Sequence, residues 1–209
     1  MVSPALHCGL ILSGADRALK QIVTIAELMK KTKKIQLPPG WTFSSANSDD
    51  YDAGIDEKVK HSGTRCVYLR SDVPEPRPLA YLSQGFSPEP YLGKRLRMSA
   101  WVKSNCQGGR AQLWLRIAGD WTSTNAKPNC FDNMDDRPIL DVTDWTQYKI
   151  VVEVPDTSTY IDFGLMLNGA GQAWVDDFSF ETVGDDVELT SSSSHVNSEP
   201  FNLNFEVSK

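Results

Sequence analysis

The pattern of apolar and polar positions changes character near residue 40. Beyond that point it consists of short runs rich in β-branched and aromatic residues, separated by Gly, Pro, Asn and Asp, which is typical of strands joined by turns. The clearest runs are residues 64–70, 79–86, 95–103, 111–118, 146–154, 160–167 and 172–180. No helical pattern interrupts them, so we expect an all-β domain of two packed antiparallel sheets rather than a parallel α/β sheet.

Alternation within three of these runs predicts which side chains share a face, because successive side chains on a strand point to opposite sides. The expected core rows are Leu96, Met98, Ala100 and Val102; Leu113, Leu115 and Ile117; and Ile161, Phe163, Leu165 and Leu167. The expected outward rows are Arg97, Ser99, Trp101 and Lys103; Gln112, Trp114 and Arg116; and Tyr160, Asp162, Met166 and Asn168. Two outward rows therefore carry a tryptophan.

Near the start of the chain, apolar residues recur at helical spacing and do not alternate as in a strand. Apolar residues at helical spacing are Leu19, Ile22, Val23, Ala26 and Met29. They predict a short amphipathic helix over residues 13–34, capped by Ser13 and ended by the Pro-Pro-Gly at 38–40. Its last turns carry Lys30, Lys31, Lys33 and Lys34. Basic side chains there complement the helix dipole, and contact with a membrane surface or an acidic partner is the alternative.

Composition limits the class of protein. The chain has 209 residues, 40% of them hydrophobic, which suffices for one well-buried core. Its net charge is −6, and no basic run lies inside the expected sandwich, so we expect that domain not to bind nucleic acid. No stretch reaches the roughly 18 apolar residues of a membrane span, and no clear signal sequence indicates a localisation.

The four cysteines are Cys8, Cys66, Cys106 and Cys130. No two of them stand at the close spacing of zinc sites. Free or buried thiols are the favoured interpretation, and a disulfide between Cys106 and Cys130 is the alternative.

A candidate ligand site follows from the outward tryptophans. An indole on a sheet face, flanked by groups such as Arg116, can stack on a sugar ring while the flanking groups bond its hydroxyls. Both Trp101 and Trp114 fit this description, although they could instead be covered by the long polar segment at residues 119–136. Long structured loops are often functional, so we expect a site between that segment and the outward face.

Within the segment, Trp121 is the residue expected to be most exposed. Asp132 and Asn133 are candidates for ligand contact, and the alternative is that they hold the loop through turn hydrogen bonds. The resulting candidate set is Trp101, Trp114, Arg116, Trp121, Asp132 and Asn133.

Signals for catalysis are weak. His7 and His195 lie in the terminal segments and His61 in a turn, so no nucleophile, base and acid arrangement can be assembled. The acidic doublets, such as Asp135-Asp136, point to opposite faces if they lie in strands, so they are not glycosidase pairs by themselves. A hydrolase whose two carboxylates come from different strands is the alternative that this pattern allows.

The run Trp-Val-Asp-Asp-Phe-Ser-Phe at 174–180 resembles the closing strand of galactose-binding-like jelly rolls, the fold of many carbohydrate-binding modules. Three further fragments fit the same pattern: Pro-Pro-Gly-Trp at 38–41, His-Ser-Gly at 61–63, and residues 92–103. The resemblance covers about residues 38–183 and implies a two-sheet jelly-roll sandwich that recognises a saccharide. Similar domains also occur as parts of esterases, proteases and transcription regulators, so the fold does not dictate the function.

The resemblance also implies a structural Ca²⁺, held by a glutamate of an Asn-Leu-Asp-Phe-Glu type motif and by an Asp of the closing strand. Calcium suits a set of oxygen ligands in flexible geometry. Here the nearest match is Asn-Leu-Asn-Phe-Glu at residues 202–206, which makes Asp176, Asp177 and Glu206 the candidate ligands. The C-terminal strand would then fold back onto the sheet; pairing with another copy, or the start of a further domain, is the alternative.

We therefore expect an N-terminal segment at 1–37, a sandwich at 38–183, a polar linker at 184–200 and a C-terminal strand at 201–209. The favoured function is a non-catalytic module that binds a saccharide or small polyol on its aromatic and polar face. A carbohydrate or ester hydrolase and a structural or regulatory protein-interaction domain are the alternatives. The sequence indicates no oligomeric state.

Overall fold

The computed structural model describes residues 35–47, 49–119 and 130–190. The chain divides into two compact units, residues 1–34 and residues 35–209, and all described residues belong to the second. The expected helix at 13–34 and the expected strand at 201–209 lie outside the described residues.

The described residues form nine strands and one turn of 3₁₀-helix. They are β1 (Thr42–Ser45), β2 (Tyr51–Asp56), β3 (Cys66–Ser71), β4 (Ala80–Phe86), η1 (Glu89–Tyr91), β5 (Lys94–Gly119), β6 (Cys130–Asp132), β7 (Ile139–Val154), β8 (Ser158–Asn168) and β9 (Gln172–Val183). Every strand pair is antiparallel. The predicted all-β antiparallel fold is therefore confirmed.

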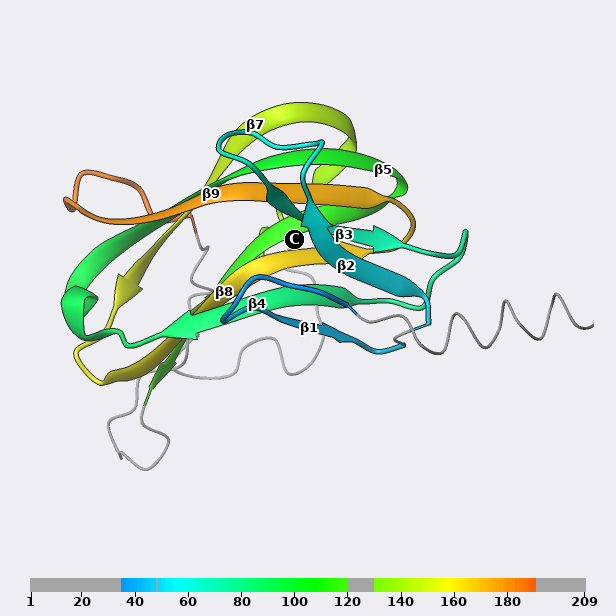
Figure 1. Cartoon of the computed structure of the whole chain (residues 1–209). Helices are drawn as coiled ribbons and strands as arrows, with labels where there is room; N and C mark the ends of the chain where they lie inside the picture. Colours follow the sequence, from blue (N-terminus) through cyan, green and yellow to red (C-terminus); the bar gives the residue numbers. More distant parts are fainter. Residues whose placement is uncertain (1–34, 48, 120–129, 191–209) are drawn as a thin grey trace, which may run out of the picture. The chain divides into compact units, whose positions relative to one another are not determined.

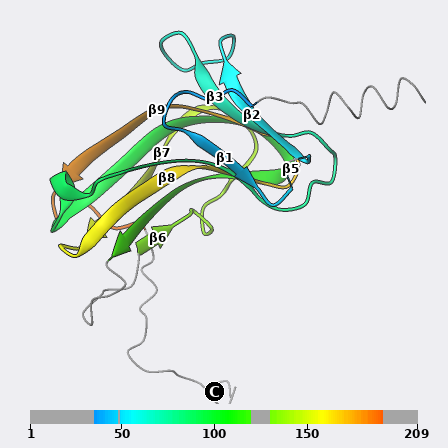
Figure 2. The ribbon, with the colours of Figure 1, turned by 60° about the horizontal axis from the view of Figure 1, so that its bottom comes forward.

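The strands are arranged in two layers (Figure 1, Figure 2). Hydrogen bonds connect them in the order β1-β4-β8-β5-β9-β3-β2, with β6 and β7 also paired to β5. One layer contains β1, β4 and β8, and the other contains β2, β3 and β9. The long strand β5 belongs to both, because its first half pairs with β9 and its second half with β8.

The sequence predicted two separate strands, at 95–103 and 111–118, where the structure has the single strand β5. The corner between its halves lies at Gly108 and Gly109, where the register with β7 shifts. Gly108 has a φ of +92°, and a Cβ on Gly109 would lie 2.3 Å from the carbonyl oxygen of Ala170. Glycine at both positions lets the backbone turn without leaving the ladder.

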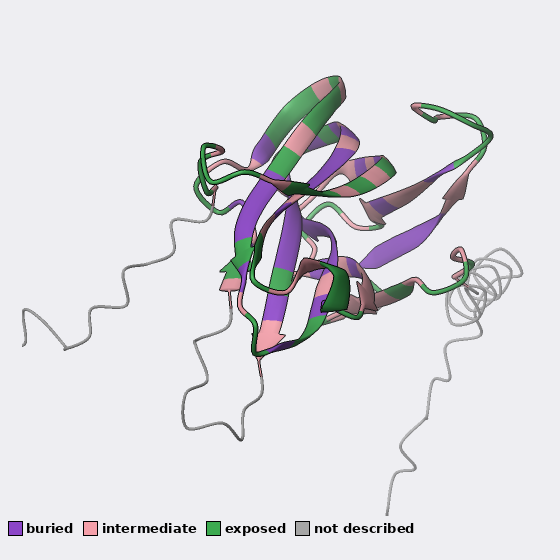
Figure 3. Ribbon diagram, turned by 90° about the vertical axis from the view of Figure 1, so that its left-hand side faces the viewer, coloured by how far each residue is buried: buried purple, intermediate pink, exposed green. Residues whose placement is uncertain are grey.

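The core lies between the layers and is built from the predicted rows. All residues of the three predicted core rows are at most 2% exposed, and purple buried segments run along the inner strands in Figure 3. Each fully buried aliphatic side chain contributes about 1.5–3 kcal/mol relative to exposure. Four partly buried aromatic residues, Trp41, Phe86, Phe178 and Phe180, pack against this core, and each contacts the ring of the core residue Phe163.

The first part of the expected linker is packed against the sandwich. Arg95 donates hydrogen bonds to the carbonyl oxygens of Asp185 (2.7 Å) and Val187 (2.5 Å). The Thr190 backbone N–H donates to the Val151 carbonyl at 3.0 Å. These bonds cover part of the outer edge of β7, so residues 184–190 are an extension of the sandwich.

Candidate functional site

A cleft lies on the outer face of the layer that contains β1, β4 and β8. Its volume is about 610 Å³. The lining residues are Ser44, Leu79, Tyr81, Ser83, Trp114, Arg116, Phe131, Asp162 and Met166. We call this set the sheet cleft.

Strand register assembles the sheet cleft from residues far apart in sequence. On β5, Trp114 and Arg116 point away from the core because Leu113 and Leu115 point into it. Across the ladder, Arg116 stands beside Asp162 of β8. Strand β8 pairs with β4, and β4 pairs with β1, so the outward residues of β4 and β1 lie next to this pair on the same face.

Aromatic side chains provide the floor and one wall of the cleft. Trp114 is only 6% exposed, and its indole N–H donates to the Leu82 carbonyl at 3.3 Å, which fixes its orientation. The Tyr81 ring meets it edge-on at 6.1 Å, and the Phe131 ring is tilted at 6.4 Å. Because Phe131 is 50% exposed, it offers the largest open aromatic surface of the cleft.

An internal ion pair provides the polar part of the cleft. The Arg116 guanidinium donates two hydrogen bonds to the two carboxylate oxygens of Asp162, one of them 2.9 Å long. This bidentate pairing raises the pKa of Arg116 above its ordinary value and is a strong, geometrically defined contact. The two charges cancel, so the lining of the cleft is neutral overall.

Trp101 lies elsewhere, on the outer face of the other layer. It is in the first half of β5, where its ring stacks on His61 at 4.0 Å with an interplanar angle of 14°. Trp145 meets the same His61 ring edge-on at 5.8 Å. Because β5 passes from one layer to the other, its outward residues face opposite sides of the sandwich, so the structure does not join Trp101 and Trp114 in one site.

Asp132 points into the protein and away from the cleft. It is 5% exposed and accepts hydrogen bonds from Arg137 (2.7 Å), the Thr190 hydroxyl (2.8 Å) and the Met134 N–H (3.0 Å). The neighbouring Asn133 accepts a bond from Gln112 at its carbonyl oxygen, at 2.7 Å. In the structure both residues hold the loop that carries Phe131, which is the alternative role that the sequence left open. Trp121 lies outside the described residues.

Asp176 and Asp177 hold the turn at residues 61–63 against β9. One carboxylate oxygen of Asp176 accepts the backbone N–H groups of His61 (3.0 Å) and Ser62 (3.1 Å). Asp177 accepts the Ser62 hydroxyl at 2.8 Å and lies 2.7 Å from His61 Nδ1. These hydrogen bonds, with His61 the larger cause, hold the pKa of Asp177 below its usual value.

The candidate calcium ligands are thus only partly described. No group of three or more His, Cys, Asp or Glu side chains within the described residues could hold a metal ion. Glu206 lies outside them. Asp176 and Asp177 are adjacent and their oxygens already accept protein hydrogen bonds, so the calcium site remains a prediction that depends on Glu206.

Cys66 and Cys106 are free, buried thiols. Burial raises the pKa of the Cys66 thiol to about 12 and that of Cys106 to about 11. Both thiols are therefore protonated at neutral pH and are poor nucleophiles. The alternative of a Cys106 to Cys130 disulfide is wrong, because Cys106 is free and Cys130 stands opposite Ile117, well along β5 from Cys106.

Sequence reasoning missed four polar or aromatic members of the cleft, which are Tyr81, Ser83, Ser44 and Phe131. Alternation in the predicted strand at 79–86 was the available signal for the first two, since Ala80 and Leu82 are fully buried beside them. No periodic pattern marks Phe131, because β6 has only three residues. Its position depends on the pairing of β6 with β5.

Comparison with known proteins gives a sequence relative and several similar structures. No family model matches the chain. The chain is 38% identical over 197 residues to an uncharacterized HTH-type transcriptional regulator, YbfP, of Bacillus subtilis (strain 168). The match covers 92% of this chain and 64% of that protein, so the chain spans less than two thirds of its relative.

One similar structure contains the CBM22-1 and GH10 modules of Clostridium thermocellum endo-1,4-β-D-xylanase 10B, complexed with xylohexaose. It has a TM-score of 0.52 and 16% identity, and the match covers 69% of this chain and 26% of that one. The C-terminal family 22 carbohydrate binding module of the same xylanase has a TM-score of 0.51 and 12% identity, over 73% of this chain and 91% of that one. The sandwich has the jelly-roll fold of carbohydrate-binding modules.

The jelly roll is not confined to such modules. The enzymatically active domain of tailspike protein 4 from bacteriophage CBA120 matches with a TM-score of 0.51 and 14% identity, over 69% of this chain and 20% of that one. At these identities the comparisons establish the fold, and a fold hosts many functions. Among the described residues, no helix is both long and apolar enough to span a membrane.

Proposed function

We propose that the sandwich binds a neutral saccharide or small polyol in the sheet cleft, and that it is the ligand-binding part of an HTH-type transcriptional regulator. The observation that carries the proposal is the cleft itself. It combines the exposed Phe131 ring, the Trp114 floor and the Arg116–Asp162 pair in about 610 Å³. This volume lies within the range of about 300–1,000 Å³ typical of small-molecule sites.

The chemistry of the cleft suits a sugar. The apolar face of a pyranose can stack on an aromatic ring, and the corresponding contact between two aromatic rings contributes about 0.5–1.5 kcal/mol beyond the buried area. The bidentate pair leaves further N–H donors on Arg116 and further lone pairs on Asp162. Hydroxyl groups both donate and accept, so a polyol can bond to both partners of the pair at once.

Charge favours a neutral ligand over an acidic one. Arg116 is already neutralised by Asp162 at hydrogen-bond distance, and no other cationic side chain among the described residues lines the cleft. A carboxylated or sulfated sugar would have to compete with Asp162 for the guanidinium. The net charge of −6 on the chain adds long-range repulsion of anions.

The comparisons support both parts of the proposal. One similar structure is complexed with xylohexaose, and another concerns ligand binding in the cleft of a carbohydrate binding module. The sequence relative is named as an HTH-type regulator, and a ligand-binding module is what such a protein needs to respond to a small molecule. Binding of a sugar would then shift the population of regulator conformations.

Isothermal titration calorimetry tests the cleft, with xylohexaose and the hexaoses of cellulose and mannan as probes. We expect at least one probe to bind the full chain, and Phe131→Ala to weaken that binding about tenfold, equivalent to about 1.4 kcal/mol. Phe131 is the variant of choice because it is half exposed, so its removal leaves the core intact.

Trp101→Ala is the matched control, since it removes an aromatic residue from the outer face of the opposite layer. It should leave the affinity unchanged. Absence of binding by all three probes, or equal affinity for wild type and Phe131→Ala, would overturn the proposed site.

A further inference from the structure

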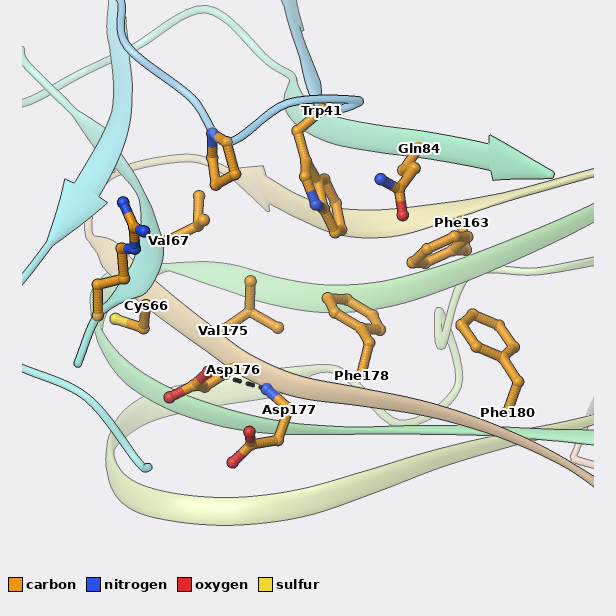
Figure 4. A pocket seen from close by; sticks show the side chains of 12 residues that line it. Trp41, Cys66, Val67, Gln84, Phe163, Val175, Asp176, Asp177, Phe178 and Phe180 are labelled. Carbon is orange, nitrogen blue, oxygen red and sulfur yellow. Dashed lines mark hydrogen bonds between the residues drawn. The ribbon is translucent and has the colours of Figure 1, made fainter. Parts of the chain in front are cut away.

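A second cavity, of about 360 Å³, opens between the two layers. Its walls come from β4, β8 and the segment that leads into β1 on one side, and from β3 and β9 on the other (Figure 4). The lining includes Trp41, Arg65, Gln84, Phe163, Asp177 and Phe178. We call it the interlayer pocket. It shares no lining residue with the sheet cleft.

Aromatic rings form the apolar wall of the interlayer pocket. Trp41 meets Phe163 edge-on at 5.5 Å and Phe178 at 5.4 Å with a tilt of 40°. Phe163 and Phe178 are themselves 5.1 Å apart. This mutual packing fixes the rings, so the wall is preformed for a flat apolar surface.

Polar groups without protein partners lie at the same cavity. The described part of the chain provides no hydrogen-bond partner for the Trp41 indole N–H, the Gln84 amide or the Arg65 guanidinium. Figure 4 shows the Gln84 amide beside the Trp41 ring at the edge of the pocket. Arg65 is exposed, and neither the Trp41 N–H nor the Gln84 amide is among the buried atoms that lack a hydrogen bond. All three groups therefore reach solvent, and a hydroxyl group of a ligand in the pocket can replace the water bound to them.

The charges at the mouth argue against an anionic ligand. The lining includes one cationic residue, Arg65, and two anionic residues, Asp176 and Asp177, so the pocket carries one more negative than positive side chain. The Asp176 and Asp177 carboxylates bond the turn at residues 61–63 and point away from the aromatic wall in Figure 4. Within the pocket, the Gln84 amide supplies both a donor and an acceptor. The pocket therefore offers both donors and acceptors, a combination that matches hydroxyl groups.

We propose that the interlayer pocket binds one uncharged, hydroxyl-bearing ring of monosaccharide size, with its apolar face against Trp41. The volume is at the lower end of the range of about 300–1,000 Å³ for small-molecule sites, which restricts the ligand to a single ring. The site is independent of the sheet cleft. Because its walls belong to both layers, a ligand there bridges them and stabilises the native state.

NMR of the indole N–H groups tests this proposal, since Trp41 and Trp114 report on different cavities. Glucose, galactose, mannose and xylose are titrated separately into the full chain, with Trp41→Phe and Trp114→Phe used to assign the two signals. We expect at least one monosaccharide to shift the Trp41 signal saturably. Gln84→Met, which keeps the side-chain length but removes the amide, should weaken that binding about tenfold, as for one lost hydrogen bond.

Phe131→Ala is the matched control, because it alters only the sheet cleft and should leave the Trp41 titration unchanged. The inference is overturned if none of the four sugars shifts the Trp41 signal, or if Gln84→Met titrates like wild type. The sheet-cleft proposal is tested by a different signal. It fails if none of the hexaoses shifts the Trp114 indole N–H signal, whatever the Trp41 signal does.

Discussion

At the scale of single residues, Asp132 was a candidate for ligand contact, but in the structure it is buried and bonds to other parts of the protein. Its side chain is 3% exposed and lies 2.7 Å from Arg137, and Thr190 completes its hydrogen bonds. The residue next to it, Phe131, faces the sheet cleft. Asp132 therefore fixes the position of the cleft wall without facing the ligand.

Removal of the Asp132 carboxylate should destabilise the protein strongly. Asp132→Ala leaves Arg137 without its buried partner and should lower the free energy of unfolding by about 3–5 kcal/mol, measured by urea denaturation. Asp136→Ala is the control, because Asp136 also bonds Arg137 at 2.7 Å but its side chain is 62% exposed; it should cost less than about 1 kcal/mol. Equal effects of the two substitutions would contradict the role assigned to Asp132.

Among the strands, the close approach of β4 and β8 determines the shape of the cleft floor. Gly164 of β8 stands opposite Ser83 of β4, and a Cβ at position 164 would lie 1.8 Å from the Leu82 carbonyl oxygen. That carbonyl also accepts the Trp114 indole N–H. The absence of a side chain at Gly164 therefore lets β4 and β8 pair closely and leaves the Leu82 carbonyl free to hold the Trp114 indole.

Gly164→Ala should force β4 away from β8 and cost about 1–3 kcal/mol, the usual effect of overpacking, with a matching drop in melting temperature. Gly85→Ala is a control in the same strand pair. The atoms nearest to a Cβ at Gly85 belong to the outer end of the Tyr160 side chain, which is 44% exposed and can turn aside. A melting temperature lowered equally by both substitutions would show that backbone contact is not the cause.

For the whole molecule, the predicted calcium site joins the sandwich to the C-terminal motif. Residues 184–190 already pack along β7 through Arg95 and Thr190. The Asn-Leu-Asn-Phe-Glu motif at 202–206 follows after a short interval. If it returns to β9, Glu206 joins Asp176 and Asp177 as a calcium ligand.

Calcium should then raise the melting temperature of the full chain, because a ligand bound only by the native state stabilises it. Differential scanning calorimetry with added CaCl₂ and with EDTA measures the shift, and Glu206→Gln should abolish it. Glu188→Gln, a change of the same chemistry outside the motif, is the control. An identical melting temperature in CaCl₂ and EDTA would exclude a structural calcium ion.

The fold was largely predictable from the sequence, and the site only in part. Period-two alternation identified the core rows, since burial of one strand face depends on local pattern alone. Trp114 and Arg116 were correctly placed on an outward face by the same rule. Alternation says nothing about which outward rows meet, so the separation of Trp101 from Trp114 could not be foreseen.

Local pattern alone therefore specifies an antiparallel sandwich, its core and the outward direction of the cleft residues on β5. The composition of the site depends on the folded chain. Folding brings Asp162 to Arg116 across 46 positions of the chain, adds Phe131 through the short strand β6, and turns Asp132 inward. The physical reason is that a strand carries its own periodicity, whereas the neighbour of each outward side chain depends on long-range register and on the corner at which β5 changes layers.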